Sequence, residues 1–224
     1  MLPVSNSGNA VIARVRSVSE PNRDTDSIKM DIDRLTQGKH VMVFSGFSGL
    51  GYKDPAKLLD QIQKELKRAI DIHGIARTCV AAGATSEGIG VVYNEAKRLS
   101  PDIVTIGVVS EQARGDDSLS SNCDHVIYVD DPEGTWKVLD ENGLSYMAYL
   151  ARNNESHSKT GEFLAFGGGA VTLSEVLEVR ELNQNWAIFT DFDPDPVKAK
   201  GKLEGSPGLD LNPVRTDWLR RFSV

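Results

Sequence analysis

The sequence predicts an α/β protein in which a doubly wound parallel sheet forms the middle of three layers, α/β/α. Short apolar runs alternate with segments of helical periodicity, which is the pattern of a parallel sheet covered by helices. The runs are apolar throughout, as expected for strands that are buried on both faces. Glycine-rich turns follow three of the runs, at the edge where such sheets bind ligands.

The expected strands are recognised by their continuous apolar residues. They are residues 40–44, 78–82, 103–109, 125–129, 163–166 and 186–190. The expected helices have apolar residues three or four positions apart, and Asp54 and Pro55 mark the start of the longest one. These helices are 28–35, 54–74, 91–99, 144–153 and 173–182, and regular structure is expected to end within 191–196.

The order of these elements predicts one domain at residues 39–200 with an extension on either side. Residues 1–38 form the expected N-terminal extension, in which the alternating stretch 11–16 predicts an edge strand. Residues 201–224 form the expected C-terminal tail, whose apolar cluster consists of Trp218, Leu219 and Phe222.

Composition excludes several classes of function. With 224 residues and a net charge of −7, the chain lacks the clustered basic residues that binding to a nucleic-acid duplex requires. No apolar run is long enough for a membrane helix, and no signal peptide is visible, so we expect a cytoplasmic protein without membrane contact. Cys79 and Cys123 lie in apolar runs and are expected as core residues, and the four histidines show no metal-ligand spacing, so no metal site is expected.

The stretch 163–175 carries the strongest functional signal. Four apolar residues run into Gly167, Gly168 and Gly169, and helical periodicity follows. Glycine lets a ligand approach the backbone, and the free N–H groups at a helix start favour an anion, most often a phosphate. Thr172 and Glu175 also have the spacing of a capping box, so capping and ligand chemistry stay open as alternatives for Glu175.

Two further turns follow the strands 40–44 and 78–82. All three turns lie at strand ends, so we expect them to face one cleft that holds the phosphates of a nucleotide. The expected binding residues are Gly46, Ser48, Gly83, Thr85, Ser86, Gly88, Gly90, Gly167, Gly168, Gly169 and Thr172. Trp136 is either a base-stacking residue or a core or lid aromatic.

Three common motifs are absent from these turns. No G-x-G-x-x-G is present, which weighs against an NAD(P)-dependent oxidoreductase. Gly83 and Gly88 have P-loop spacing, but Ile89 occupies the place of the required lysine. Leu50 occupies the place of the second glycine of G-x-S-x-G, so Ser48 is expected to contact phosphate and not to act as a nucleophile.

The motifs that are present resemble those of the SLOG superfamily, over residues 40–191. The stretch 43–49, Val-Phe-Ser-Gly-Phe-Ser-Gly, resembles the opening V-F-x-G-x-S-x-G of the Lonely Guy group, often labelled lysine decarboxylase-like. The group's PGGxGTxxE signature is matched at Gly168, Gly169, Thr172 and Glu175, whereas Gly167 replaces the proline and Val171 replaces the last glycine.

The resemblance implies a Rossmann-like fold and two functions. Lonely Guy enzymes are nucleoside 5′-monophosphate phosphoribohydrolases, and the resemblance implies Glu175 and Arg152 as catalytic residues, although Asn153 replaces the lysine that follows the arginine in that group. Other SLOG members, among them the ADP-ribose-sensing domains of TRPM channels, bind nucleotides in the same cleft without necessarily cleaving them. We therefore expect binding of a nucleotide or an ADP-ribose-like molecule, with hydrolysis as the alternative. We expect no cofactor beyond a bound nucleotide and, by analogy with the enzymes, a homodimer.

Overall fold

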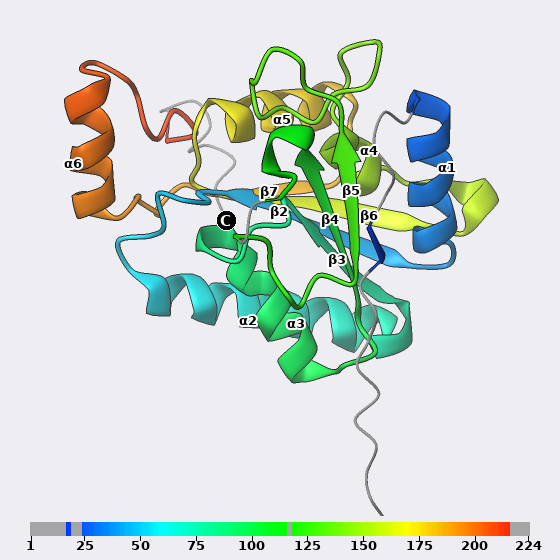
Figure 1. Cartoon of the computed structure of the whole chain (residues 1–224). Helices are drawn as coiled ribbons and strands as arrows, with labels where there is room; N and C mark the ends of the chain where they lie inside the picture. The colour runs from blue at the N-terminus through cyan, green and yellow to red at the C-terminus, as the bar shows by residue number, and fades with distance from the viewer. Residues whose placement is uncertain (1–16, 19–23, 116–117, 216–224) are drawn as a thin grey trace, which may run out of the picture.

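The computed structural model describes residues 17–18, 24–115 and 118–215, which build one seven-stranded sheet (Figure 1). The strands are β1 (Ser17–Val18), β2 (His40–Gly46), β3 (Thr78–Ala82), β4 (Val104–Ser110), β5 (His125–Val129), β6 (Thr160–Phe166) and β7 (Trp186–Phe189). Their order is β1-β5-β4-β3-β2-β6-β7, and every pair is parallel. The chain builds outward from β2 to β5 and then returns to the other side of β2 with β6 and β7.

Helices cover both faces of the sheet. They are α1 (Thr25–Thr36), α2 (Pro55–His73), α3 (Val91–Leu99), α4 (Tyr146–Ala151), α5 (Ala170–Glu181) and α6 (Pro196–Gly205). Short 3-10 turns occupy Ile75–Arg77, Gly88–Gly90, Glu111–Ala113 and Glu155–His157. Figure 1 shows α2 and α3 below the sheet and α1, α4 and α5 on its other side. The predicted three-layer α/β/α, doubly wound, Rossmann-like fold is therefore confirmed.

Central strand β2 explains why the apolar runs are continuous. Met42 and Phe44 belong to the core beneath α2 and α3, whereas Val41 and Val43 belong to the core beneath α1, α4 and α5. Side chains alternate between the faces of a strand, so a strand buried on both faces must be apolar at every position. All four side chains are fully buried.

The start of β6 cannot be recognised from continuous apolar residues alone. The strand begins at Thr160 and not at residue 163, because polar side chains at its start are paired. The imidazole of His40 lies 2.9 Å from Thr160 Oγ1 and 3.1 Å from Glu162 Oε1. These contacts continue the register of β6 with β2, in which His40 faces Thr160.

Helix α6 contradicts the expectation that regular structure ends within 191–196. Asp195 accepts hydrogen bonds at 2.9 Å from the backbone N–H groups of Val197 and Lys198, and Pro196 occupies the first turn. None of the helical residues is buried, so the sequence lacks the apolar periodicity by which helices are recognised. Helix α4 also ends earlier than expected, at Ala151.

The expected N-terminal extension contains elements that pack with the sheet. Ile28 and Ile32 of α1 are buried in the core that also holds Val41 and Val43, and β1 pairs with β5 at the sheet edge. The expected strand at 11–16 and the cluster of Trp218, Leu219 and Phe222 lie outside the described residues.

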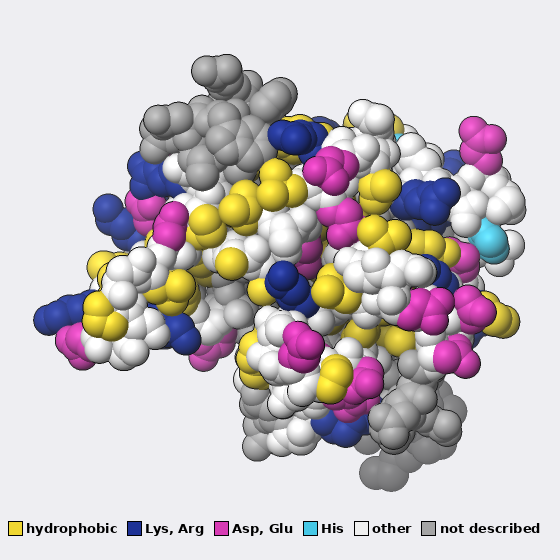
Figure 2. Space-filling model, turned by 90° about the horizontal axis from the view of Figure 1, so that it is seen from above, with side chains coloured by type: hydrophobic (Ala, Val, Ile, Leu, Met, Phe, Trp, Pro, Cys, Tyr) yellow, Lys and Arg dark blue, Asp and Glu magenta, His cyan; other side chains and the backbone are white. Residues whose placement is uncertain are grey.

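The surface and the core contain the types of residue expected of a folded domain. On the face shown in Figure 2, acidic, basic and hydrophobic side chains are interspersed. Cys79 and Cys123 are both buried, as expected of core residues. Within residues 17–18, 24–115 and 118–215, no helix is long and apolar enough to cross a bilayer, and no three potential ligands from His, Cys, Asp and Glu gather around a common point.

Candidate functional site

A cavity of about 200 Å³ opens at the carboxyl ends of the central strands. It lies beside β2, where the chain switches from one half of the sheet to the other, and this is where doubly wound sheets bind ligands. Its lining comprises Phe44, Ser45, Gly46, Ser48, Gly83, Thr85, Ile89, Val108, Val109, Ser110, Trp136, Val138, Met147, Val171, Thr172 and Glu175.

The structure brings together parts of all three glycine turns. Of the residues expected from the sequence, the cavity lining includes Gly46, Ser48, Gly83, Thr85, Thr172 and Glu175. The other expected residues, Ser86, Gly88, Gly90, Gly167, Gly168 and Gly169, belong to the same turns but are not among the lining residues. Several of these glycines are instead required by the backbone conformation or the close packing of the turns.

Gly88 and Gly90 allow the second turn to pack closely. A Cβ on Gly88 would lie 2.1 Å from the carbonyl oxygen of Phe47, and the backbone of Gly88 has a φ of +58°. A Cβ on Gly90 would lie 1.8 Å from the carbonyl oxygen of Thr85. The neighbouring Ile89 N–H donates to the Phe47 carbonyl at 2.7 Å. Gly88 therefore lets the second turn pack on the first, Gly90 lets the second turn pack on itself, and neither is among the residues that line the cavity.

The triple glycine has a similar structural component. Gly167 and Gly168 have φ values of +56° and +134°, which favour glycine. The Gly168 N–H donates to Asn212 Oδ1 at 3.2 Å, so a residue of the expected tail already uses this donor. Gly169 is the N-cap residue of α5 and has no side chain that could accept from the first N–H groups of the helix.

The capping-box interpretation of Thr172 and Glu175 is wrong. Helix α5 begins at Ala170, so Thr172 is its third residue and Glu175 lies in the second turn. The Glu175 carboxylate accepts instead from Ser45 Oγ of β2, at 2.6 Å, and Thr172 Oγ1 lies 3.1 Å from the same Ser45 oxygen. The helix start is thus left free on the cavity side, and the glutamate is tied to the sheet.

Glu175 has a strongly perturbed acidity. Its side chain is buried, and burial raises the pKa from 4.5 to about 7, with the hydrogen bond from Ser45 opposing this rise and the charge of Glu178 adding to it. Near neutral pH the carboxyl group therefore exchanges between its protonated and ionised forms. A group with such a pKa can act both as hydrogen-bond donor and as acceptor toward a bound molecule.

Replacing Ser45 by alanine is expected to raise the pKa of Glu175 further, because the charged carboxylate loses its donor while it stays buried. Titration of the Glu175 carboxyl carbon by ¹³C NMR measures this change. Ser48→Ala is the matched control, because Ser48 also lines the cavity and has no hydrogen bond to Glu175. An unchanged or lower pKa in Ser45→Ala would show that Ser45 does not stabilise the ionised form.

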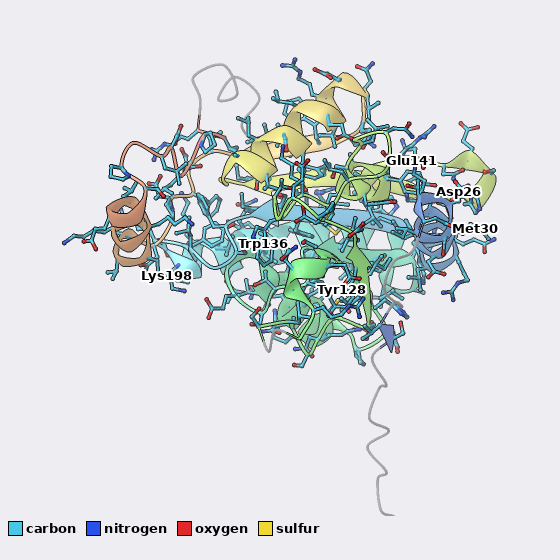
Figure 3. The ribbon with its side chains drawn as sticks, turned by 45° about the horizontal axis from the view of Figure 1, so that its top comes forward. Asp26, Met30, Tyr128, Trp136, Glu141 and Lys198 are labelled. Atoms are coloured by element: carbon cyan, nitrogen blue, oxygen red, sulfur yellow. The ribbon has the colours of Figure 1, made fainter. Side chains whose placement is uncertain are left out.

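Trp136 projects over the cavity from a loop that a buried carboxylate organises. Asp131 accepts from Ser110 Oγ at 2.8 Å, from the Trp136 N–H at 2.8 Å and from the Thr135 N–H at 3.0 Å. Burial by itself would raise the pKa of Asp131, but these hydrogen bonds hold it below its ordinary value. Trp136 has a φ of +62° and is 55% exposed, so it is not a core aromatic, whereas the stacking and lid alternatives both stay open (Figure 3).

Arg152 lies away from this cavity. The resemblance implies that Arg152 acts together with Glu175, but Arg152 is not among the residues that line this cavity. It follows the last residue of α4 and lines two other cavities, beside Tyr149. The cavity residue from the same helix is Met147, near its first turn. Since β6 starts shortly after Arg152, the arginine lies toward the amino-terminal end of the sheet, opposite the glycine turns.

Sequence reasoning missed the polar residues that end two strands. Ser45 precedes Gly46 in β2, and Ser110 is the last residue of β4. Both follow apolar runs, and both donate to a carboxylate that lies far away in the sequence. The sequence feature that could have identified both serines is a hydroxyl residue near the carboxyl end of an otherwise apolar strand.

No protein-family model matches the chain, and no curated protein matches it. One similar solved structure is the molybdenum cofactor carrier protein of Chlamydomonas reinhardtii, with 20% identity, a TM-score of 0.46, and coverage of 76% of this chain and 87% of that one. Another is the molybdenum cofactor binding protein of Rippkaea orientalis, with 16% identity, a TM-score of 0.43, and coverage of 82% and 95%. Neither similarity assigns a ligand to this chain, and no comparison places it with the Lonely Guy enzymes or the TRPM domains.

Proposed function

We propose that the protein binds a phosphate-bearing small molecule of the nucleotide class in the cavity at the carboxyl ends of its strands. The observation that carries this proposal is the uncapped start of α5, where Val171 and Thr172 line the cavity and Gly169 has no capping side chain. The free N–H groups and the positive end of the helix dipole attract an anion. Among the described residues of the lining there is no basic side chain, so the backbone supplies this attraction.

The remaining walls suit a flat ring. Ile89, Val138 and Met147 offer apolar surface, and the partly exposed Trp136 lines the cavity and offers an aromatic ring for stacking. Thr85, Ser48 and Ser110 offer hydroxyl groups at the edges. This combination of apolar walls, a few polar groups and one perturbed carboxyl group is typical of a small-molecule site.

Cleavage of the N-glycosidic bond is the second candidate, and one observation favours it. The pKa of about 7 for Glu175 suits a group that activates water or stabilises a cationic sugar near neutral pH. The position of Arg152 removes the other expected catalytic residue from the cavity. Binding without cleavage is therefore the proposed activity, and base release from a nucleoside monophosphate distinguishes the two.

The test uses mononucleotides, ADP-ribose, NAD, molybdenum cofactor and the matching nucleosides, measured by thermal shift and native mass spectrometry. We expect at least one phosphorylated compound to be retained without loss of its base, and its unphosphorylated counterpart to bind at least about tenfold more weakly. Released base that disappears in Glu175→Gln would establish the hydrolase instead. A folded protein that retains none of the compounds would contradict both candidates.

A matched glycine pair tests the place of binding. A Cβ on Gly83 or on Gly49 meets no atom within 4 Å, so both alanine variants are expected to fold, but only Gly83 lines the cavity. We expect Gly83→Ala to weaken ligand binding at least about tenfold and Gly49→Ala to leave it unchanged. Equal affinity of the two variants would place the ligand elsewhere.

A further inference from the structure

A second polar cavity, of about 350 Å³, lies toward the amino-terminal end of the sheet. Asp33 comes from α1, Tyr149 comes from α4, and the connection from α4 to β6 supplies the other lining residues. These are Arg152, Asn153, Asn154, Glu155, Ser156 and Lys159. Because the seven residues of β6 separate Lys159 from the glycine turn, the two cavities are about 20 Å apart.

Backbone hydrogen bonds hold the loop between α4 and β6 in a defined conformation. Asn154 and Lys159 exchange two backbone hydrogen bonds, of 2.9 and 3.0 Å, around a 3-10 turn at Glu155–His157. The Gly38 N–H donates to the carbonyl of His157 at 2.9 Å and ties the loop to the chain before β2. These bonds hold the lining residues of the loop in place before any ligand arrives.

Lys159 is a buried cation with few partners. Its side chain lies almost entirely out of solvent, and its Nζ donates to the Tyr149 carbonyl at 3.0 Å and lies 5.3 Å from the centre of the Tyr149 ring. Burial lowers its pKa to about 8, although the charge of Asp33 opposes this change. An ammonium group has three N–H donors, and among the described residues Lys159 uses one of them, so two remain for a ligand.

Asp33 is the anionic residue of the cavity whose charge acts on Lys159. Its Oδ2 accepts from the Tyr149 hydroxyl at 2.9 Å, whereas its Oδ1 is buried and has no hydrogen-bond partner among the residues that the structure describes. A buried carboxylate oxygen without a donor is costly, and native proteins rarely leave one unless water, an ion or a ligand completes it. The cavity thus contains a cation and an anion that are both incompletely bonded.

Further donors lie on the loop. Asn153 Oδ1 accepts from the Gly161 N–H at 3.0 Å, and Asn154 Oδ1 accepts from Ser156 Oγ at 2.7 Å. The acceptor ends of both amides are therefore used, and their N–H₂ ends remain. Arg152 is exposed, and within the described part of the chain no hydrogen bond or ion pair holds its guanidinium.

We propose that this cavity is a second binding site, for a small zwitterion of the α-amino acid class. The ligand carboxylate lies between the guanidinium of Arg152 and the ammonium of Lys159, and the ligand ammonium faces Asp33. The lining has two cationic and two anionic side chains, so a simple anion meets Asp33 and Glu155, and a simple cation meets Arg152 and Lys159. A neutral ligand with separated charges satisfies both pairs.

Isothermal titration calorimetry with the twenty free amino acids, on the full chain at pH 7, tests the site. We expect at least one amino acid to bind with a Kd below about 1 mM, and its N-acetyl and methyl ester derivatives to bind at least about tenfold more weakly. Absence of binding by every amino acid at about 10 mM would overturn the proposal. So would an N-acetyl derivative that binds as tightly as the free amino acid, since only a carboxylate would then be recognised.

Arg152→Gln locates the site without disturbing the core, because Arg152 is exposed. We expect it to weaken amino-acid binding at least about tenfold. The control is Arg34→Gln, an exposed arginine on the same helix as Asp33 that does not line the cavity. Unchanged binding in Arg152→Gln, or an equal loss in both variants, would overturn the assignment. Gly83→Ala should leave amino-acid binding intact, which separates this proposal from that for the first cavity.

Discussion

Replacing Gly88 by alanine is expected to cost about 3 kcal/mol or more of unfolding free energy. Two effects add at this position. The backbone φ of +58° is unfavourable for a residue with a side chain, and the new Cβ would lie 2.1 Å from the carbonyl oxygen of Phe47 and 2.3 Å from that of Ser48. Both obstacles are backbone atoms, so no flexible side chain can move aside. Chemical denaturation of the two proteins measures the difference.

Gly49→Ala is the control for this prediction, because Gly49 lies in the facing turn and a Cβ there meets nothing within 4 Å. We expect its stability to stay within about 1 kcal/mol of the parent. If Gly88→Ala were as stable as Gly49→Ala, the close packing of the first turn on the second would be wrong. The two turns would then not shape the cavity as described.

Glu175→Gln is expected to remove a pH dependence of stability. The pKa of Glu175 rises from 4.5 to about 7 on folding, so the folded state holds a proton that the unfolded state releases in this interval. Its contribution to stability is fully present below pH 4.5 and is lost as the pH rises through about 7, an effect of about 3 kcal/mol. The glutamine variant, which keeps an acceptor for Ser45, should therefore become progressively more stable than the parent between pH 5 and 8.

Urea denaturation at several pH values measures this difference between the two proteins. Glu204→Gln on the exposed helix α6 is the control, and its difference from the parent should stay constant with pH. A constant difference for Glu175→Gln as well would mean that Glu175 keeps an ordinary pKa in the folded protein. The interpretation of Glu175 as a perturbed group at the cavity floor would then be lost.

The parts of the fold that could be predicted are those that burial dictates. Strands β3 and β5 and helix α3 match the expected ranges, because the buried residues within each element are mostly apolar. Polar residues that are paired inside the structure escape this criterion, as Thr160 and Glu162 do at the start of β6. Helix α6 escapes it as well, since it buries no residue and depends on a cap at Asp195.

The candidate site could be predicted only in part, for a related reason. Glycine turns at strand ends are visible in the sequence, and the parallel sheet places Gly46, Gly83 and the start of α5 at one edge. The partner of Glu175 is not visible, because Ser45 is 130 positions away and meets it only in the folded chain. Arg152 was expected at the cavity but is not among its lining residues. Its position depends on where α4 ends, and the sequence does not show that the helix ends at Ala151.

The most direct test of the central claim is a calorimetric comparison of one phosphorylated ligand with its unphosphorylated form, in the parent and in Gly83→Ala. The account predicts that loss of the phosphate weakens binding to the parent at least about tenfold, because the free N–H groups at the start of α5 lose their anion. It also predicts that Gly83→Ala weakens binding of the phosphorylated form. Equal affinities for the two forms, or a Gly83→Ala protein that binds as the parent does, would contradict it.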